Sequence, residues 1–194
     1  MEYVAGKLIK ELREKKSMTQ KQLADQLNVS DKAISKWETN RGYPDVSILS
    51  ELAAALGVSV AELLVGTYQE NHNRSSNMQK TVFYVCPVCG NIIAASGKGA
   101  YSCCGILLPE LEPETGEDPA HGLRLEVVDN EYFVSMDHEM TKSHYISFFA
   151  YVTSGHVELV KLYPEQNAEA RFPNRGHGLL YGYCNRHGLF RVRV

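Results

Sequence analysis

In the first third of the chain the apolar positions recur three or four residues apart, which is the spacing of an amphipathic helix. Val4 and Leu12 belong to the first such stripe. Thr19 and Ser59 each precede a later stripe and are followed three positions on by Gln or Glu, as in a capping box. The pattern predicts an all-α domain of five short helices, the fourth over residues 46–56.

Beyond residue 80 apolar and polar residues alternate, which is the period of a half-buried strand. Residues 67–80 are polar and rich in Asn and Ser, so we expect a linker there. Residues 109–119 read as an acidic connector. Short alternating runs separated by turn residues predict a small immunoglobulin-like β-sandwich. The predicted strands are TVFYV, LRLEVV, EYFVSM, HYISFFAYV, HVELVKLY, LLYGY and LFRVRV.

Length and composition fit such a multidomain chain. It has 194 residues, of which 44% are hydrophobic and 22% charged, enough apolar material for a core. It has no apolar run long enough to span a membrane and no apolar signal-peptide core, so we expect a cytoplasmic protein. The net charge is −3, and residues 1–66 carry nine basic and nine acidic side chains. Nucleic-acid binding would therefore depend on a local basic surface.

All five cysteines have the spacing of metal ligands. Cys86 and Cys89 form a C-x-x-C pair, which is followed by the adjacent cysteines 103 and 104. Cys184 lies three residues before His187. Thiolates and imidazoles grouped in this way are typical ligands of a transition metal. Reducing conditions in the cytoplasm favour metal binding over disulfides, which remain the minor alternative.

The helical segment resembles the Xre/phage-repressor helix-turn-helix family, on the ordered motifs T-Q-x-x-L-A, V-S, I-S-x-W-E and L-A-x-x-L-x-V. The resemblance implies binding to double-stranded DNA, with the helix that begins at Ser30 in the major groove. A protein-interaction role is the alternative, because a fold does not fix a function. By this resemblance Gln20 contacts a phosphate, and the other implied contacts are Ser30, Asp31, Lys32, Ser35, Lys36, Asn40 and Arg41.

The segment FYVCPVCGNIIAASGKGAYSCCG resembles desulforedoxin, the four-cysteine module that begins many desulfoferrodoxins. The resemblance implies one tetrahedral metal site, which would hold iron or zinc. A purely structural zinc knuckle is the alternative. The implied ligands are Cys86, Cys89, Cys103 and Cys104.

The motif D-H-E-M-x-x-x-H-Y-I, which contains His138 and His144, is followed after about 40 residues by C-N-x-H-G-L, which begins at Cys184. Together these motifs resemble the superoxide reductase centre, in which four histidines and one axial thiolate bind iron. That family reduces superoxide to hydrogen peroxide with one electron and two protons, at a sixth, open position. His121 is assigned as the first ligand because it precedes the first predicted strand of the sandwich. The implied iron ligands are His121, His138, His144, Cys184 and His187, whereas His72, His156 and His177 are interpreted as ordinary histidines.

This chain departs from the superoxide reductase pattern around the implied ligands. The lysine that usually precedes the first histidine, and that attracts superoxide, is Ala120 here. Lys142 would take its catalytic place if its loop folds over the iron. The proline after the second histidine is Glu139, and two shielding tryptophans have become Phe148 and Phe190.

The predicted order is a helix-turn-helix domain (1–66), a linker (67–80), a desulforedoxin-like module (81–115) and a superoxide reductase-like sandwich (116–194). The leading hypothesis is a homodimeric transcription regulator whose iron domain senses superoxide or another small oxidant. The second is a superoxide reductase that carries a DNA-binding domain. The third is a DNA-binding protein whose metals are structural.

Overall fold

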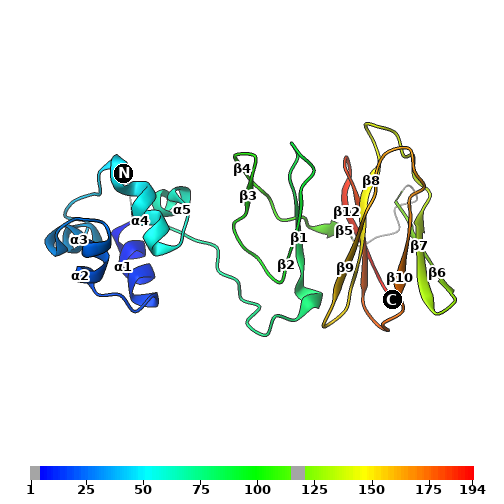
Figure 1. The fold of residues 1–194 in the computed structure, drawn as a ribbon, viewed down its shortest axis with the longest axis horizontal. Coiled ribbons are helices and arrows are strands. Elements are labelled where there is room, and N and C mark those ends of the chain that lie inside the picture. Colours follow the sequence, from blue (N-terminus) through cyan, green and yellow to red (C-terminus); the bar gives the residue numbers. More distant parts are fainter. Residues whose placement is uncertain (1–4, 115–120) are drawn as a thin grey trace. The chain divides into compact units, whose positions relative to one another are not determined.

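The computed structural model describes residues 5–114 and 121–194, and it divides the chain into two compact units that meet between Gln69 and Glu70. The first unit is helical and the second is built from β-strands (Figure 1). The predicted fold class, a helical domain followed by a small β module and a β-sandwich, is confirmed.

The helical unit buries the apolar stripes in one core, in which the single tryptophan, Trp37, is 8% exposed. Capping boxes at Thr19 and Ser59 start their helices as predicted, whereas Val4 lies outside the described residues. The predicted fourth helix begins as a separate 3₁₀ turn. The helices are α1 (Gly6–Lys15), α2 (Gln20–Gln26), α3 (Asp31–Glu38), η1 (Val46–Ile48), α4 (Leu49–Leu56) and α5 (Val60–Val65).

A buried ion pair joins α1 to the end of α3. The Arg13 guanidinium donates to the two carboxylate oxygens of Glu38 at 2.5 and 3.1 Å and to the Met18 carbonyl at 2.7 Å. Gln20 adds a hydrogen bond to Glu38 at 2.8 Å. Only 9% of the Arg13 side chain and 2% of the Glu38 side chain are exposed. This network fixes the start of α2 against α3, the helix expected to read DNA.

The N-terminal part of the second unit is a small module of two hairpins, which positions the cysteine pairs. One hairpin pairs β1 with β2, and the other pairs β3 with β4, both antiparallel. Gly90 (φ +68°) and Gly105 (φ +77°) follow the two cysteine pairs in left-handed backbone that favours glycine. The elements are η2 (Met78–Lys80), β1 (Val82–Val85), β2 (Ile92–Ala95), β3 (Ser102–Cys103) and β4 (Ile106–Leu107).

The rest of the second unit is a sandwich of a three-stranded sheet, in the order β10-β7-β6, and a five-stranded sheet, in the order β5-β12-β11-β8-β9 (Figure 1). The two inner faces enclose one apolar core that also contains Cys184. The strands are β5 (Pro113–Glu114), β6 (Leu123–Val128), β7 (Glu131–Met136), β8 (Ile146–Val152), β9 (Val157–Lys161), β10 (Glu169–Pro173), β11 (Leu179–Cys184) and β12 (Gly188–Arg193).

The outer face of the five-stranded sheet forms a second core with the cysteine module. The Phe148 ring lies 5.5 Å from that of Phe83 and stacks on Tyr183 at 5.4 Å. The expectation that Phe148 shields the iron is therefore wrong. Successive side chains of a strand point to opposite faces, so Phe148 on β8 faces the module while Phe149 faces the inner core.

The segment expected to be a linker, residues 67–80, has structure at both ends. Tyr68 packs on the helical core. Asn73 is 7% exposed, and its amide donates to the carbonyls of Asn77 (2.9 Å) and Ser96. Of the predicted connector 109–119, residues 115–119 lie outside the described residues.

Candidate metal centres and nucleic-acid interface

One end of the sandwich brings together the five residues that the superoxide reductase resemblance implies, here called the His/Cys site. His121 lies just before β6, His138 and His144 lie in the loop from β7 to β8, and the β11–β12 turn provides the last two. One ligand atom from each residue lies within 4.8 Å of all the others. The His/Cys site is His121, His138, His144, Cys184 and His187.

The spacing of these atoms fits one metal ion. His187 Nδ1 lies 3.0 Å from His121 Nε2 and 3.1 Å from His144 Nε2. The Cys184 sulfur is 3.5 Å from His187 Nδ1 and 3.6 Å from His138 Nε2. With metal–nitrogen bonds of about 2.1 Å, nitrogens at right angles around an ion lie about 3 Å apart. Four nitrogens and one sulfur around a single ion account for these distances.

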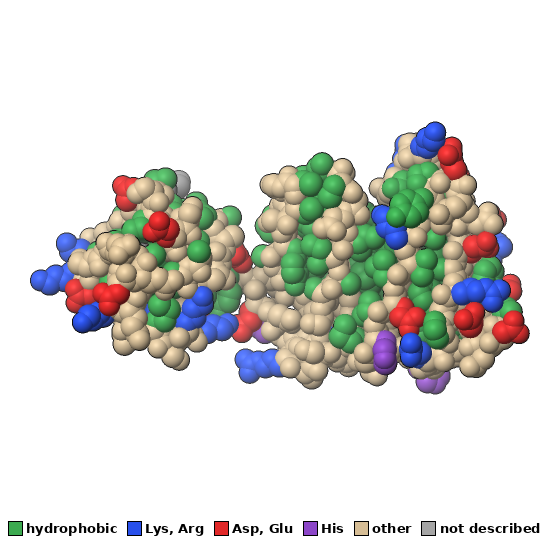
Figure 2. Space-filling view, viewed as in Figure 1, with side chains coloured by type: hydrophobic (Ala, Val, Ile, Leu, Met, Phe, Trp, Pro, Cys, Tyr) green, Lys and Arg blue, Asp and Glu red, His purple; other side chains and the backbone are tan. Residues whose placement is uncertain are grey.

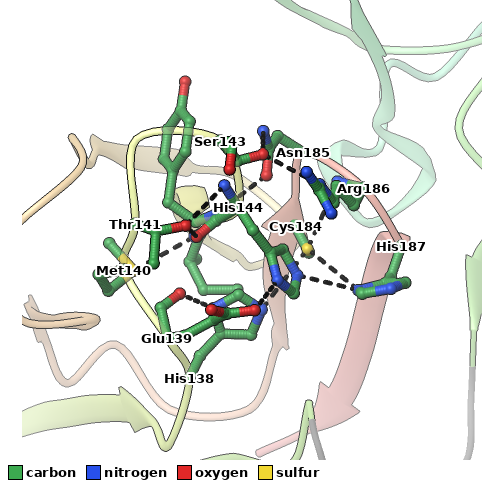
Figure 3. Close-up of polar contacts among 12 residues, drawn as sticks. His138, Glu139, Met140, Thr141, Ser143, His144, Cys184, Asn185, Arg186 and His187 are labelled. Carbon is green, nitrogen blue, oxygen red and sulfur yellow. Dashed lines mark hydrogen bonds and ion pairs between the residues drawn. The ribbon is translucent and has the colours of Figure 1, made fainter.

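Glu139 holds two of the imidazoles in the tautomer that a metal requires (Figure 3). Its main-chain carbonyl contacts His138 Nδ1, and its carboxylate contacts His144 Nδ1. When Nδ1 donates its proton to these oxygens, the Nε2 lone pair of each ring faces the common centre. Burial lowers the pKa of His138, which also favours the neutral ring.

Asn185 fastens the Cys184 turn to the histidine loop (Figure 3). Its side-chain oxygen accepts from the Tyr145 N–H at 2.9 Å, and its amide donates to the Ser143 carbonyl at 3.1 Å. The Arg186 N–H points at the Cys184 sulfur from 3.5 Å. These contacts fix the Cys184 sulfur beside the histidine loop, and an N–H group directed at a metal-bound sulfur stabilises its negative charge.

The site is apolar on one side and open to solvent on another. Phe190 stacks on His121 with ring centroids 4.4 Å apart, which agrees with the cover expected from the sequence. Cys184 and His121 are buried, whereas His187 is exposed. Such a site admits a small polar molecule while the thiolate stays dry.

Lys142, expected to replace the missing lysine, lies exposed on the loop between the two histidines. Its ammonium group is 3.8 Å from the Glu165 carboxylate, and both side chains are more than two-thirds exposed. Ala120 lies outside the described residues. A catalytic role for Lys142 remains a prediction.

The second cluster is the four-cysteine site: Cys86, Cys89, Cys103 and Cys104. Sulfur–sulfur distances are 3.6 Å between Cys89 and Cys103 and 3.9 Å between Cys103 and Cys104. With metal–sulfur bonds of about 2.3 Å, the sulfurs of a tetrahedral site lie about 3.8 Å apart. The four-cysteine site therefore fits one tetrahedral ion.

The pKa shifts at the four-cysteine site also favour a bound cation. Main-chain N–H groups of Cys89 and Val88 lower the pKa of Cys86 to about 7. The neighbouring sulfurs, that of Cys89 first, raise the pKa of Cys104 to about 12. Four thiolates this close repel one another, and a bound metal ion removes that penalty.

The residues expected to contact DNA gather at α2 and α3. Ser30 caps α3 by accepting from the Ala33 N–H at 3.2 Å, and Lys32, Lys36 and Arg41 are exposed. In Figure 2, Lys and Arg side chains project from the end of this unit where α3 lies. Asp31 and Ser35 also lie on α3. A helix with exposed cations at one end of a helical unit suits the major groove.

Two of the expected DNA contacts have internal partners. One amide hydrogen of Gln20 is engaged by Glu38, which leaves its second hydrogen for a phosphate. The Asn40 side-chain oxygen accepts from the Gly6 N–H at 3.0 Å and so joins the end of α3 to the start of α1. A Cβ on Gly6 would lie 2.0 Å from the Trp37 carbonyl oxygen, so α1 approaches α3 closely there. Sequence reasoning missed this structural role of Asn40.

Among the described residues, the three histidines interpreted as ordinary, His72, His156 and His177, belong to neither metal cluster. The part of the chain that the structure describes also has no helix long and apolar enough to cross a membrane.

Comparison with known proteins gives relatives for both units. The helix-turn-helix family profile matches residues 9–63. The HTH-type transcriptional activator BcrR of Enterococcus faecalis is 43% identical over 81 residues, which is 40% of this chain and 39% of that protein. Desulfoferrodoxin of Clostridium acetobutylicum is 35% identical over 60 residues, 31% of this chain and 48% of that protein. The chain thus spans less than half the length of these two relatives.

A solved structure resembles the second unit. The superoxide reductase of Treponema pallidum superposes with a TM-score of 0.52 and covers 59% of this chain and 98% of its own. Its sequence identity is 21%, so the likeness shows a shared fold.

Proposed function

Because this chain joins an Xre-type helix-turn-helix domain to a desulfoferrodoxin-like domain, we propose that it is a DNA-binding transcription regulator whose iron responds to superoxide or to redox state. The observation that carries the proposal is the meeting of four imidazoles and one thiolate within 4.8 Å in a chain that also has a helix-turn-helix domain. The number of ligands favours iron over a purely structural zinc ion, because structural zinc sites are closed by four ligands and this site has five.

DNA binding is proposed for α2 and α3. The Lys32, Lys36 and Arg41 side chains supply positive charge for phosphates, while Ser30, Asp31 and Ser35 supply short polar groups for base edges. A homodimer would place two such helices one turn of DNA apart, as helix-turn-helix proteins do.

The chain's own residues prepare the His/Cys site for a one-electron change. Iron bound there supplies the redox chemistry. Glu139 accepts hydrogen bonds from Nδ1 of two imidazoles, His138 and His144, which leaves their Nε2 atoms to bind the metal, and the Arg186 N–H would stabilise the negative charge of a metal-bound Cys184 sulfur. Phe190 and the inner core keep water from Cys184, whereas the exposed side at His187 lets a small oxidant approach.

Oxidation of bound iron would add one positive charge to this site. The proposed response is a change in the spacing or orientation of the two α3 helices of a homodimer, and hence in their fit to DNA. Coupling of this kind typically changes an affinity about 5- to 150-fold. The four-cysteine site is proposed to hold iron or zinc, with an electron-transfer role if iron is present.

Superoxide reduction is the second candidate, favoured by a five-ligand site that faces solvent on one side. Lys142 is its proposed proton and charge source, since Ala120 cannot serve. Turnover would be slow, because Lys142 lies beside Glu165 and Glu139 adds negative charge close to the ligands.

Metal analysis and an absorption spectrum of protein purified without oxygen test these proposals together. The sensor and the enzyme both require iron and, once that iron is oxidised to Fe³⁺, a thiolate charge-transfer band, whereas a protein that contains only zinc would contradict both. Superoxide consumption then separates them. For a sensor we expect little turnover in the wild type and a gain in Ala120→Lys. Fast turnover by the wild type favours the enzyme.

A further inference from the structure

We infer that Glu139 is a positioning residue for the His/Cys site, and that its carboxylate lowers the reduction potential of the bound metal through His144. The inference rests on the iron site of the proposed function and goes beyond it. Neither the relatives nor the resemblance assigns this role, and the family pattern has a proline at this position.

The loop between β7 and β8 turns the carboxylate towards the ligand. The Thr141 N–H donates to the His144 carbonyl at 2.9 Å, and the Thr141 hydroxyl accepts from the His144 N–H at 3.1 Å. This reciprocal pair closes the loop and returns the His144 ring over Glu139 (Figure 3). The Met140 carbonyl accepts from the Glu165 N–H at 2.7 Å, and this bond fixes Met140, which lies between Glu139 and Thr141.

The contact is a hydrogen bond between an exposed carboxylate and a ring that is mostly buried. The Glu139 carboxylate meets His144 Nδ1, while His144 Nε2 points at the other donor atoms. The His144 side chain is 12% exposed and that of Glu139 is 58% exposed. A carboxylate on the far nitrogen fixes the tautomer and makes the near nitrogen a stronger donor.

A stronger donor and a nearby negative charge both stabilise the more positive oxidation state. Fe³⁺ gains more from them than Fe²⁺, so the potential falls and the metal is oxidised more readily. The main-chain carbonyl that orients His138 belongs to the same residue, but no side-chain substitution removes it. Side-chain variants of Glu139 therefore act on His144 without releasing His138.

The test compares Glu139→Gln and Glu139→Ala with a matched control, Glu165→Gln, in the full chain loaded with iron. Glutamine keeps an acceptor oxygen and removes the charge, whereas alanine removes both. Glu165 is an exposed carboxylate that contacts Lys142 and no ligand ring. The readouts are the midpoint potential of the iron band, the position of that band, and the affinity of metal-free protein for iron.

We expect Glu139→Gln to keep its iron and lose about tenfold more affinity for Fe³⁺ than for Fe²⁺, which raises the potential by about 59 mV for one electron. Glu139→Ala should show the same rise and bind iron about 10- to 100-fold more weakly, the usual cost of losing such a partner. Glu165→Gln should match the wild type in both readouts.

Equal potentials in the wild type and Glu139→Gln overturn the inference, and so does an equal rise in Glu165→Gln, because the effect would then be one of surface charge. Both results leave the iron site of the proposed function intact. A wild type that takes up no iron at the His/Cys site overturns the inference and the proposed function together.

Discussion

Breaking the buried ion pair between Arg13 and Glu38 should destabilise the helical unit more than any exposed charge change. Glu38→Ala leaves a guanidinium that is 9% exposed without its carboxylate, while its bond to the Met18 carbonyl remains. Removing one partner of a buried pair costs about 3–5 kcal/mol. Replacing both charges, as in Arg13→Met with Glu38→Leu, should cost far less, because apolar side chains of similar volume can fill the same space.

The chain contains its own probe for this experiment. Trp37 is the single tryptophan and is buried in the core of the helical unit, so its fluorescence follows unfolding of that unit in the full-length protein. Urea titration of the wild type, the two single variants and the double variant gives a double-mutant cycle.

Glu14→Gln is the matched control, since Glu14 is 55% exposed and contacts the same arginine at 3.4 Å. Its loss should cost less than about 1 kcal/mol, as for exposed ion pairs. A cost below about 1 kcal/mol for Glu38→Ala, or a double variant as unstable as the single ones, would mean that burial gives this ion pair no special weight.

Three further predictions concern DNA, metal and pH. Lys36→Ala should weaken binding to a duplex selected from a random library and should reduce the slope of log affinity against log salt concentration by about one. Lys15→Ala is the control and should change neither, because Lys15 lies over the Tyr68 ring. Equal effects of the two variants in fluorescence anisotropy would contradict this prediction. Elemental analysis should show that Cys184→Ala loses the metal ion of the His/Cys site and that Cys89→Ser loses the ion of the four-cysteine site, because the two sites share no ligand. Loss of both ions from either variant would contradict independent sites. Burial raises the pKa of Glu38, but hydrogen bonds from Arg13 and Gln20 lower it more, so the folded pKa of Glu38 lies below its usual value. The ionised Glu38 therefore stabilises the helical unit fully above the unfolded pKa of about 4.3. This stabilisation is lost as the pH falls through the folded pKa. Trp37 fluorescence should show this acid loss, and an equal loss in Glu38→Gln would contradict it.

The grouping of the His/Cys site was predictable because its candidate ligands lie next to strands whose alternating pattern is visible in the sequence. His121 precedes an alternating strand, and Cys184 and His187 flank the turn between two others. Antiparallel strands joined by short turns bring such ends together. The grouping of the candidate ligands therefore follows from the sequence, while their role in binding metal is proposed.

Other features depend on contacts that periodicity does not reveal. Strands β3 and β4 have two residues each, too few to show alternation. Strand β10, Glu169–Pro173, alternates between buried and exposed residues but is short and ends in proline, so it resembles a loop. The sequence alone places Phe148 near the iron motifs, and the strand's register directs it to the other face.

Glu139 illustrates the same limit at the site itself. In the sequence it is a negative charge beside an implied ligand, at a position where the family pattern has a proline. The structure turns its carboxylate onto His144, because Thr141 closes the loop between the two histidines. The contact between Glu139 and His144, which are five residues apart, depends on the geometry of the loop. The spacing of residues in a sequence does not predict that geometry.

We propose that the metal state of the second unit changes DNA binding by the first. The most direct measurement is the binding isotherm of iron-loaded protein for its selected duplex at fixed salt, before oxidation, after oxidation by superoxide, and after re-reduction. Cys184→Ala serves as the control that binds DNA without responding. We predict a reversible change in Kd of about fivefold or more in the wild type alone. Superimposable isotherms for the reduced and oxidised wild type would contradict the account.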